Sequence, residues 1–419
     1  MPKPTVTSSP IAKVLLGFGV IAMTSSGMAA TEDQRPTGLN GATWQFGPLN
    51  RWAYTHMSEV LPSKTIRRGA AAPRPIPGLS DAADDLEISW EGSPTPLSQL
   101  MEEQYVDGLL VIKDGKAVVE RYAGTLTAER THLLWSVSKT ITGLTAASVA
   151  ADGLIDLDHT VGDYVPELAN SGWGTDSLRD ILDMRDGSEW NEDYAAADST
   201  VRRQDCSDGL LTGPDCAGVD VTGNYVFLPA VGRMPGRQGS FVYKSGTTDV
   251  MAWVLEAATG QRFADLVSER IWQRIGADQD AGITVDTGGF TLASGGMHAT
   301  LRDVARVGQL MLNFGKSGDT QVIPKAWLQD IFSDDGSRSW PHPAAAGTRP
   351  YYRSFVWGLG DGRGSVQARG VHGQVIHVGP ESGVVIVMLS SWPDAEGGAA
   401  NVGFPQQQQL IESIEAALR

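Results

Sequence analysis

The segment Ser136-Val137-Ser138-Lys139 holds a hydroxyl and an amine three residues apart, and it is the only Ser-x-x-Lys in the chain. On a helix this spacing puts both side chains on one face, in contact. A serine hydroxyl becomes nucleophilic when a neighbour takes its proton, and a lysine can take it if burial lowers its pKa. The Ser136 backbone N–H, at a helix start, would also donate to a developing oxyanion. The segment therefore predicts a serine nucleophile with a lysine base.

A second proton-handling segment, Tyr243-Lys244-Ser245, lies just before an expected helix at 247–259. A phenol close to a charged amine can ionise or pass a proton to a leaving group, so Tyr243 is the expected second base and acid. Ser245 lies in the same segment and is a candidate substrate contact. The alternative is a loop tyrosine that only packs on its ring.

Two histidine segments are further candidates for substrate or oxyanion contacts. His372-Gly373-Gln374 lies on an expected strand at 371–378. There the Val375 N–H could be the second oxyanion donor, and Gly373 could let a substrate approach the backbone. His298 follows a Gly-Gly turn and could line a cleft. Structural roles for both histidines, in packing or in capping, stay open.

The elements around these residues predict an α+β fold with an antiparallel sheet flanked by helices. Asp114-Gly115 joins two apolar runs at 108–112 and 117–122, which is a hairpin signal. The spacing of apolar residues indicates four helices, and the Thr300 to Asp303 spacing of a capping box begins the third. These helices are expected at 136–152, 247–259, 301–314 and 406–418. Hairpins that flank helices are typical of the α+β class.

The chain is expected to divide into an export signal, a leader and two lobes. Residues 1–30 carry two lysines before a short apolar run and then small residues, as signal peptides do. The apolar run is shorter than the roughly 20 residues of a membrane span, so a periplasmic or secreted protein is expected. The predicted leader at 31–85 packs on the body. The rest is predicted to form an α/β lobe at 86–165 and 240–419 and an inserted helical and loop lobe at 166–239.

Charge and cysteine content restrict the partners. With 33 basic and 49 acidic residues the net charge is −16, which opposes nucleic acid and anionic membrane as partners. Cys206 and Cys216 are the only cysteines and could form a disulfide in an oxidising compartment, or remain as two free thiols. The seven histidines show no metal-ligand spacing, so neither a metal nor a cofactor is expected. The oligomeric state stays open.

The order Ser-x-x-Lys, Tyr-x-Ser about a hundred residues later, then a His-Gly strand resembles the class C β-lactamase superfamily, with its penicillin-binding-protein relatives. The run at 295–306, Gly-Gly-Met-x-Ala-Thr-x-x-Asp-x-Ala-Arg, is similar to that family too. The resemblance covers about 99–419. It implies a β-lactamase/transpeptidase-like fold with Ser136, Lys139 and Tyr243 in a cleft between two lobes.

Within that superfamily, Asn50-Arg51-Trp52 and the segment 183–194 look like the 6-aminohexanoate-dimer hydrolases, which are nylon-oligomer amidases, and their esterase relatives. By that resemblance Tyr194 would hydrogen-bond an amide leaving group. The implied reaction is hydrolysis of a small amide or ester through an acyl-enzyme on Ser136.

Three other functions are weighed against the amidase. A carboxylesterase would use the same residues. β-Lactamase or D-amino-acid peptidase activity ranks low, because His372-Gly373-Gln374 stands where those enzymes carry Lys-Thr-Gly. The lysine of that motif carries the charge that would bind a β-lactam carboxylate, and this chain lacks it there. A non-catalytic relative that binds cell-wall fragments is the alternative outside the enzymes.

Overall fold

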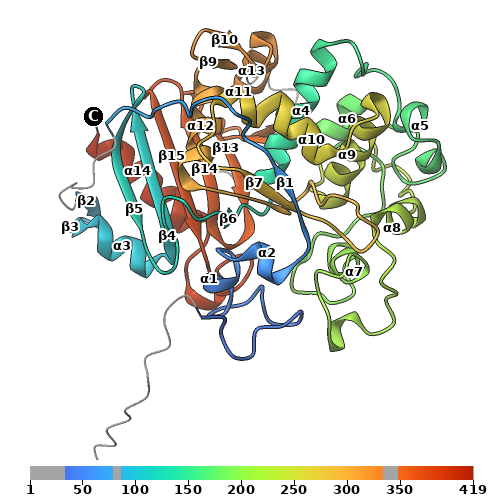
Figure 1. The fold of residues 1–419 in the computed structure, drawn as a ribbon, viewed down its shortest axis with the longest axis horizontal. Helices are drawn as coiled ribbons and strands as arrows, with labels where there is room; N and C mark the ends of the chain where they lie inside the picture. The colour runs from blue at the N-terminus through green and yellow to red at the C-terminus, as the bar shows by residue number, and fades with distance from the viewer. Residues whose placement is uncertain (1–33, 79–85, 334–347, 419) are drawn as a thin grey trace, which may run out of the picture. The chain divides into compact units, whose positions relative to one another are not determined.

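A seven-stranded antiparallel sheet occupies the centre of the fold (Figure 1). The structure is a computed structural model that describes residues 34–78, 86–333 and 348–418. The strand order is β11-β12-β13-β14-β15-β4-β5. The strands are β4 (Val106–Lys113), β5 (Lys116–Tyr122), β11 (Tyr351–Arg353), β12 (Val356–Gly358), β13 (Val366–Gly370), β14 (Gln374–Gly379) and β15 (Val384–Ser390). Strands β4 and β5 form the hairpin predicted at Asp114-Gly115.

Helices cover both faces of this sheet, which explains the apolar sequence of its central strands. All seven residues of β15 are buried, and alternate side chains enter different cores. Val385 and Val387 face the core shared with α4 (Val137–Ala151), α9 (Ser245–Thr259) and α12 (Leu301–Leu312). Ile386 and Met388 face the core shared with α3 (Leu97–Glu103) and α14 (Phe404–Ala417). The α+β architecture is confirmed, and α4 carries the predicted nucleophile segment.

A second, four-stranded sheet brings the N-terminal segment to the helix that begins after Ser136. Its order is β1-β7-β8-β6, and it contains β1 (Ser63–Ile66), β6 (His132–Leu133), β7 (Ala281–Thr284) and β8 (Met297–Ala299). Strand β6 ends three residues before Ser136, so this sheet fixes the approach of the chain to α4. Two short hairpins complete the sheets: β2 (Glu87–Trp90) with β3 (Ser93–Pro96), and β9 (Lys316–Ser317) with β10 (Thr320–Gln321).

Residues 166–239 contain helices and loops, as the predicted inserted lobe requires. Its elements are η1 (Pro166–Leu168), α6 (Leu178–Leu182), α7 (Thr200–Ser207), η2 (Pro214–Cys216) and α8 (Asn224–Ala230). The other helices are α1 (Asn50–Ala53), α2 (Met57–Val60), α5 (Val161–Tyr164), α10 (Phe263–Val267), η3 (Ser268–Trp272), α11 (Gln273–Ile275), α13 (Lys325–Phe332), η4 (Val371–Gly373) and η5 (Gly398–Ala400). Residues from Arg35 onward form one compact unit, and the lobe boundaries stay a prediction.

Most helix predictions agree with the structure, and one strand prediction does not. Thr300 caps α12 by accepting a hydrogen bond from the Asp303 N–H, as its spacing predicted. The strand predicted at 371–378 begins only at Gln374, because Val371–Gly373 form a turn in which His372 has a φ of 59°. The predicted signal peptide at 1–30 lies outside the described residues. Within the described ranges, no helix combines the length and apolar character that a membrane crossing requires.

Candidate active site

Ser136 and Lys139 meet at the start of α4. The Lys139 Nζ donates to the Ser136 Oγ at 2.8 Å, the contact that their spacing predicted. The lysine is only 1% exposed. Burial penalises its charged form and lowers the pKa of Lys139 to about 8, while the charge of Glu192 acts in the opposite direction. A neutral amine is therefore accessible near neutral pH.

The partners of Lys139 determine where a neutral amine would point its lone pair. Nζ contacts the carbonyl oxygen of Ser294 at 2.7 Å and the Ser245 Oγ at 3.0 Å. A carbonyl only accepts, and the single hydrogen of the Ser245 hydroxyl is donated to the Glu192 Oε1 at 2.5 Å. Both hydrogens of a neutral amine are thus used on these two partners. The lone pair that remains faces the Ser136 hydroxyl, an arrangement in which Lys139 can accept the hydroxyl proton.

Glu192 is a site residue that sequence reasoning missed. Its carboxylate accepts from the Ser245 N–H at 2.8 Å and from the Tyr194 hydroxyl at 2.6 Å, in addition to the Ser245 hydroxyl. The Trp190 indole N–H donates to it at 2.5 Å. Because Ser245 is the first residue of α9, the carboxylate also lies at the positive end of that helix. Glu192 falls inside the 183–194 segment, but no spacing rule indicates a partner 53 residues away.

Tyr243 lies over Lys139, with its ring centroid 5.2 Å from Nζ. Its ring also stacks on Trp357 at 5.1 Å between centroids. Burial raises the pKa of Tyr243, and a side-chain hydrogen bond with Ser136 offsets this only in part. The phenol therefore stays protonated at working pH. It fits the predicted role of acid, whereas the role of ionised base is not supported.

Val375 does not lie at the site, so the prediction that its N–H serves as oxyanion donor is wrong. Strand β14 is an inner strand, and Val375 pairs with Arg369 on one side and Met388 on the other, which uses its backbone groups within the sheet. The turn after β13, rather than β14, lies beside Ser136. A Cβ on Gly370 would lie 3.0 Å from the Ser136 nitrogen, and Val371 lines the space around Ser136.

His372 and Gly373 pack against the tryptophans next to the site rather than contacting a substrate. The His372 Nδ1 contacts the Trp392 carbonyl oxygen at 2.7 Å, its ring stacks on Trp135, and burial lowers its pKa to about 4. A Cβ on Gly373, whose φ is 90°, would lie 2.5 Å from the Trp392 ring. The glycine is therefore needed by an indole rather than by a substrate. His372 does border one of the two cavities described below.

His298 is also structural, which corrects its assignment to the cleft. It lies on β8, where its Nδ1 contacts the Thr131 Oγ1 at 3.0 Å. Burial lowers its pKa to about 4. It is absent from the described residues that line the two cavities beside Ser136.

Two cavities with different chemistry meet at Ser136. Tyr194, Val371 and Glu396 line both of them together with the nucleophile. The first, of about 260 Å³, is rich in carboxylates. Its acidic lining residues are Asp193, Asp205, Asp208, Asp394 and Glu396. The second, of about 870 Å³, is aromatic, and its lining includes Phe241, Tyr243, Trp357, Phe404 and the cation of Arg369.

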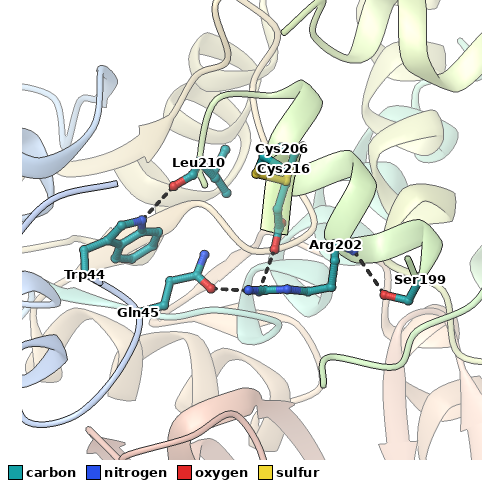
Figure 2. The surroundings of a disulfide bond; sticks show 8 residues. Trp44, Gln45, Ser199, Arg202, Cys206, Leu210 and Cys216 are labelled. Carbon is teal, nitrogen blue, oxygen red and sulfur yellow. Dashed lines mark hydrogen bonds and ion pairs between the residues drawn. A yellow bond between two sulfur atoms is a disulfide. The ribbon is translucent and has the colours of Figure 1, made fainter. Parts of the chain in front are cut away.

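Helix α7 forms one wall of the first cavity and is fixed at both ends (Figure 2). Arg202 pairs with Asp205 at 3.1 Å and donates to the Gln45 Oε1 at 3.0 Å. Of the two possibilities for Cys206 and Cys216, the structure has the disulfide, which joins the end of α7 to η2. Burial raises the pKa of Asp205 to about 7, although Arg202 opposes this.

No metal centre emerges from the described residues, which include no group of three or more His, Cys, Asp or Glu side chains arranged to hold an ion.

Comparisons with known proteins agree with this geometry. A family model described as Beta-lactamase matches residues 97–403. The chain is 36% identical over 359 residues to the 6-aminohexanoate-dimer hydrolase of Paenarthrobacter ureafaciens, covering 84% of this chain and 88% of that protein. A solved structure from Bacillus anthracis, provisionally named a 6-aminohexanoate-dimer hydrolase, matches with a TM-score of 0.82 and 27% identity over 91% of this chain and 97% of its own.

A more distant structure shares the fold alone. The octameric penicillin-binding protein homologue from Pyrococcus abyssi matches with a TM-score of 0.53 and 16% identity, over 76% of each chain.

Proposed function

The chain belongs to the β-lactamase family, and on that premise we propose that it hydrolyses small linear amides of the 6-aminohexanoate-dimer kind through an acyl-enzyme on Ser136. One observation carries the proposal. Lys139 is buried, and its two fixed acceptors direct the lone pair of its neutral form at the Ser136 hydroxyl. A binding protein without catalysis has no need of a desolvated amine beside a hydroxyl.

The proposed reaction has two steps. Lys139 takes the Ser136 proton while Oγ attacks the amide carbon, and the backbone N–H groups of Ser136 and Val371 receive the developing oxyanion. Tyr243 gives its proton to the leaving nitrogen, the C–N bond breaks, and the proton on Lys139 then passes to the Tyr243 phenolate, which restores the neutral amine and the phenol. A water molecule then attacks the acyl carbon with Lys139 as base, which releases the acid and restores Ser136.

The substrate class is supported by the relatives and by the first cavity. Two relatives bear the 6-aminohexanoate-dimer hydrolase name. The acyl half of such a dimer ends in an ammonium group, and the carboxylates of the first cavity would attract a cation. Tyr194 lies where both cavities meet, and its hydroxyl is held by Glu192.

Export is part of the proposal. The pattern at residues 1–30 supports it, and so does the Cys206–Cys216 disulfide, since disulfides persist mainly in oxidising compartments. Fractionation of cells that express the full chain would test it, and recovery of the protein in the cytosol with residues 1–30 intact would contradict it.

Substitution of the nucleophile tests the mechanism. Ser136→Ala should abolish amide turnover and labelling by a fluorophosphonate probe, while Ser93→Ala, at an exposed serine of β3, should leave both unchanged. Retained turnover in Ser136→Ala would reject the mechanism. A panel of 6-aminohexanoate oligomers, short esters and nitrocefin then ranks the substrates. Activity on esters alone would favour the carboxylesterase alternative. Rapid nitrocefin hydrolysis would show that the protein is a β-lactamase rather than an amidase.

A further inference from the structure

Arg369 lies in the wall of the larger cavity, and no described residue is its counter-ion. Among the described residues that line this cavity it is the only positively charged side chain. Its Nε donates to the Gln367 Oε1 at 2.5 Å, but its two terminal nitrogens make no hydrogen bond, and its guanidinium no ion pair, with any described residue. Burial lowers the pKa of Arg369 to about 10, which still leaves it charged.

The guanidinium is held in place by aromatic rings. It lies 6.0 Å from the Trp357 ring centroid and 5.9 Å from the Phe404 ring centroid. Such packing fixes a planar guanidinium at little entropic cost on binding, and its remaining donors match the two oxygens of a carboxylate. A half-buried arginine that is fixed in this way, and whose terminal nitrogens bind no described residue, is suited to an anionic ligand.

The position of Tyr243 indicates which half of the substrate enters this cavity. Tyr243 lines the larger cavity and is absent from the described lining of the smaller one. Because Tyr243 is the proposed proton donor to the leaving nitrogen, the leaving amine must lie on its side, in the cavity of Arg369. The acyl half then lies in the smaller cavity, whose lining includes Asp193, Asp394 and Glu396.

The other carboxylates of the larger cavity do not neutralise Arg369. Glu192 accepts four hydrogen bonds of its own. Asp361 pairs with Arg363, and Glu412 is exposed to solvent and accepts from the Gln408 amide at 2.9 Å. Glu396 is exposed to solvent, where its charge is screened.

We propose that Arg369 binds a free carboxylate on the leaving-amine half of the substrate, so that the enzyme prefers amides whose amine portion is an ω-amino acid. This inference rests on the proposed amide hydrolysis and adds the chemical identity and direction of the leaving group. It assigns Arg369 a role in specificity rather than in bond cleavage.

A matched substrate pair tests the inference. The pair is 6-aminohexanoyl-6-aminohexanoate and the same molecule with its terminal carboxylate converted to a carboxamide. The wild-type protein should cleave the acid with a kcat/KM about tenfold or more above that of the carboxamide, as expected for a charge-assisted bidentate pair. Arg369→Gln should reduce this ratio to about two or less, and Arg369→Lys, which keeps the charge, should retain part of it. Arg274→Gln, at an exposed arginine of α11, serves as the control and should keep the wild-type ratio.

Binding to an inactive variant separates this inference from the proposed function. N-Acetyl-6-aminohexanoate and its carboxamide are titrated calorimetrically into Ser136→Ala protein, with and without Arg369→Gln and Arg369→Lys. Tighter binding of the acid that needs a charge at position 369 supports the inference even if no amide is cleaved. Equal binding and equal turnover of acid and carboxamide by the wild-type protein would overturn it while leaving amide hydrolysis intact. A preference that survives Arg369→Gln in a folded variant would overturn it as well.

Discussion

Glu192→Gln offers a sharp test of the proton arrangement around Lys139. With a pKa of about 8, Lys139 is neutral in about 1% of molecules at pH 6, about 10% at pH 7 and half at pH 8. Because the proposed base is the neutral form, the acylation rate should rise about fiftyfold between pH 6 and pH 8 and then level. The acid limb should therefore have its midpoint close to pH 8.

Removing the Glu192 charge should move that midpoint down. Ser245 Oγ lies 3.0 Å from Nζ and 2.5 Å from the carboxylate, so the two charges are at most about 5.5 Å apart. At an effective dielectric constant of about 20 they attract by about 3 kcal/mol, which stabilises the protonated amine. Without this attraction Lys139 loses its proton more easily, and the midpoint should fall by as much as about two pH units.

The acylation rate that is reached at high pH should fall as well in Glu192→Gln. The new carboxamide can donate an N–H to the Ser245 oxygen. The serine hydrogen is then free to point at the Lys139 lone pair, which no longer faces Ser136. A plateau loss of about tenfold or more is expected for a misdirected base. The acylation burst with p-nitrophenyl acetate, followed from pH 5.5 to 9, measures both quantities. Glu189→Gln, at an exposed glutamate of the same segment, should change neither. A midpoint that stays near pH 8 or rises in Glu192→Gln would refute the reasoning.

Three further substitutions have defined outcomes. Tyr194→Phe removes the hydroxyl at the junction of the cavities, so kcat/KM for amides should fall about tenfold more than for esters; equal losses would exclude a role in amide selectivity. Lys244→Met removes the ion-pair partner, at 2.7 Å, of the buried Asp186, and the free energy of unfolding in denaturant should drop by about 3–5 kcal/mol; a loss below about 1 kcal/mol would contradict this. Replacing Cys206 and Cys216 together by serine reopens a loop with a separation of 10 residues and should cost about 3 kcal/mol in the same assay, whereas an unchanged midpoint would show that the bond adds no stability.

Local patterns predicted the parts of the site that are local in sequence. The contact of Ser136 with Lys139 follows from helical spacing, and the disulfide joins cysteines ten residues apart. The β4–β5 hairpin and helix α12 likewise follow from a turn dipeptide and a capping pair. In each case the interacting groups lie within about one turn or one loop of each other.

Contacts between distant segments were missed or misplaced. Glu192 binds Ser245 across 53 residues, and Arg202 binds Gln45 across 157. The sequence predicts an oxyanion donor at Val375 because residues 371–373 resemble the start of a strand, and the positive φ of His372 has no clear sequence signal. The sequence predicts that Gly373 lets a substrate approach the backbone, but the neighbour that excludes a Cβ there is the Trp392 ring, which only the packing of the turn reveals.

The segment before residue 97, where the family match begins, supplies part of the catalytic domain. The Trp44 ring stacks on Trp135 beside the nucleophile, Gln45 holds Arg202, and β1 completes the edge of the smaller sheet against β7. A gene shortened to the matched region would encode a protein with an unprotected β7 edge, which invites intermolecular strand pairing and aggregation. Affinity tags and fusion partners for producing this enzyme are therefore best attached ahead of Arg35, with everything from there onward kept.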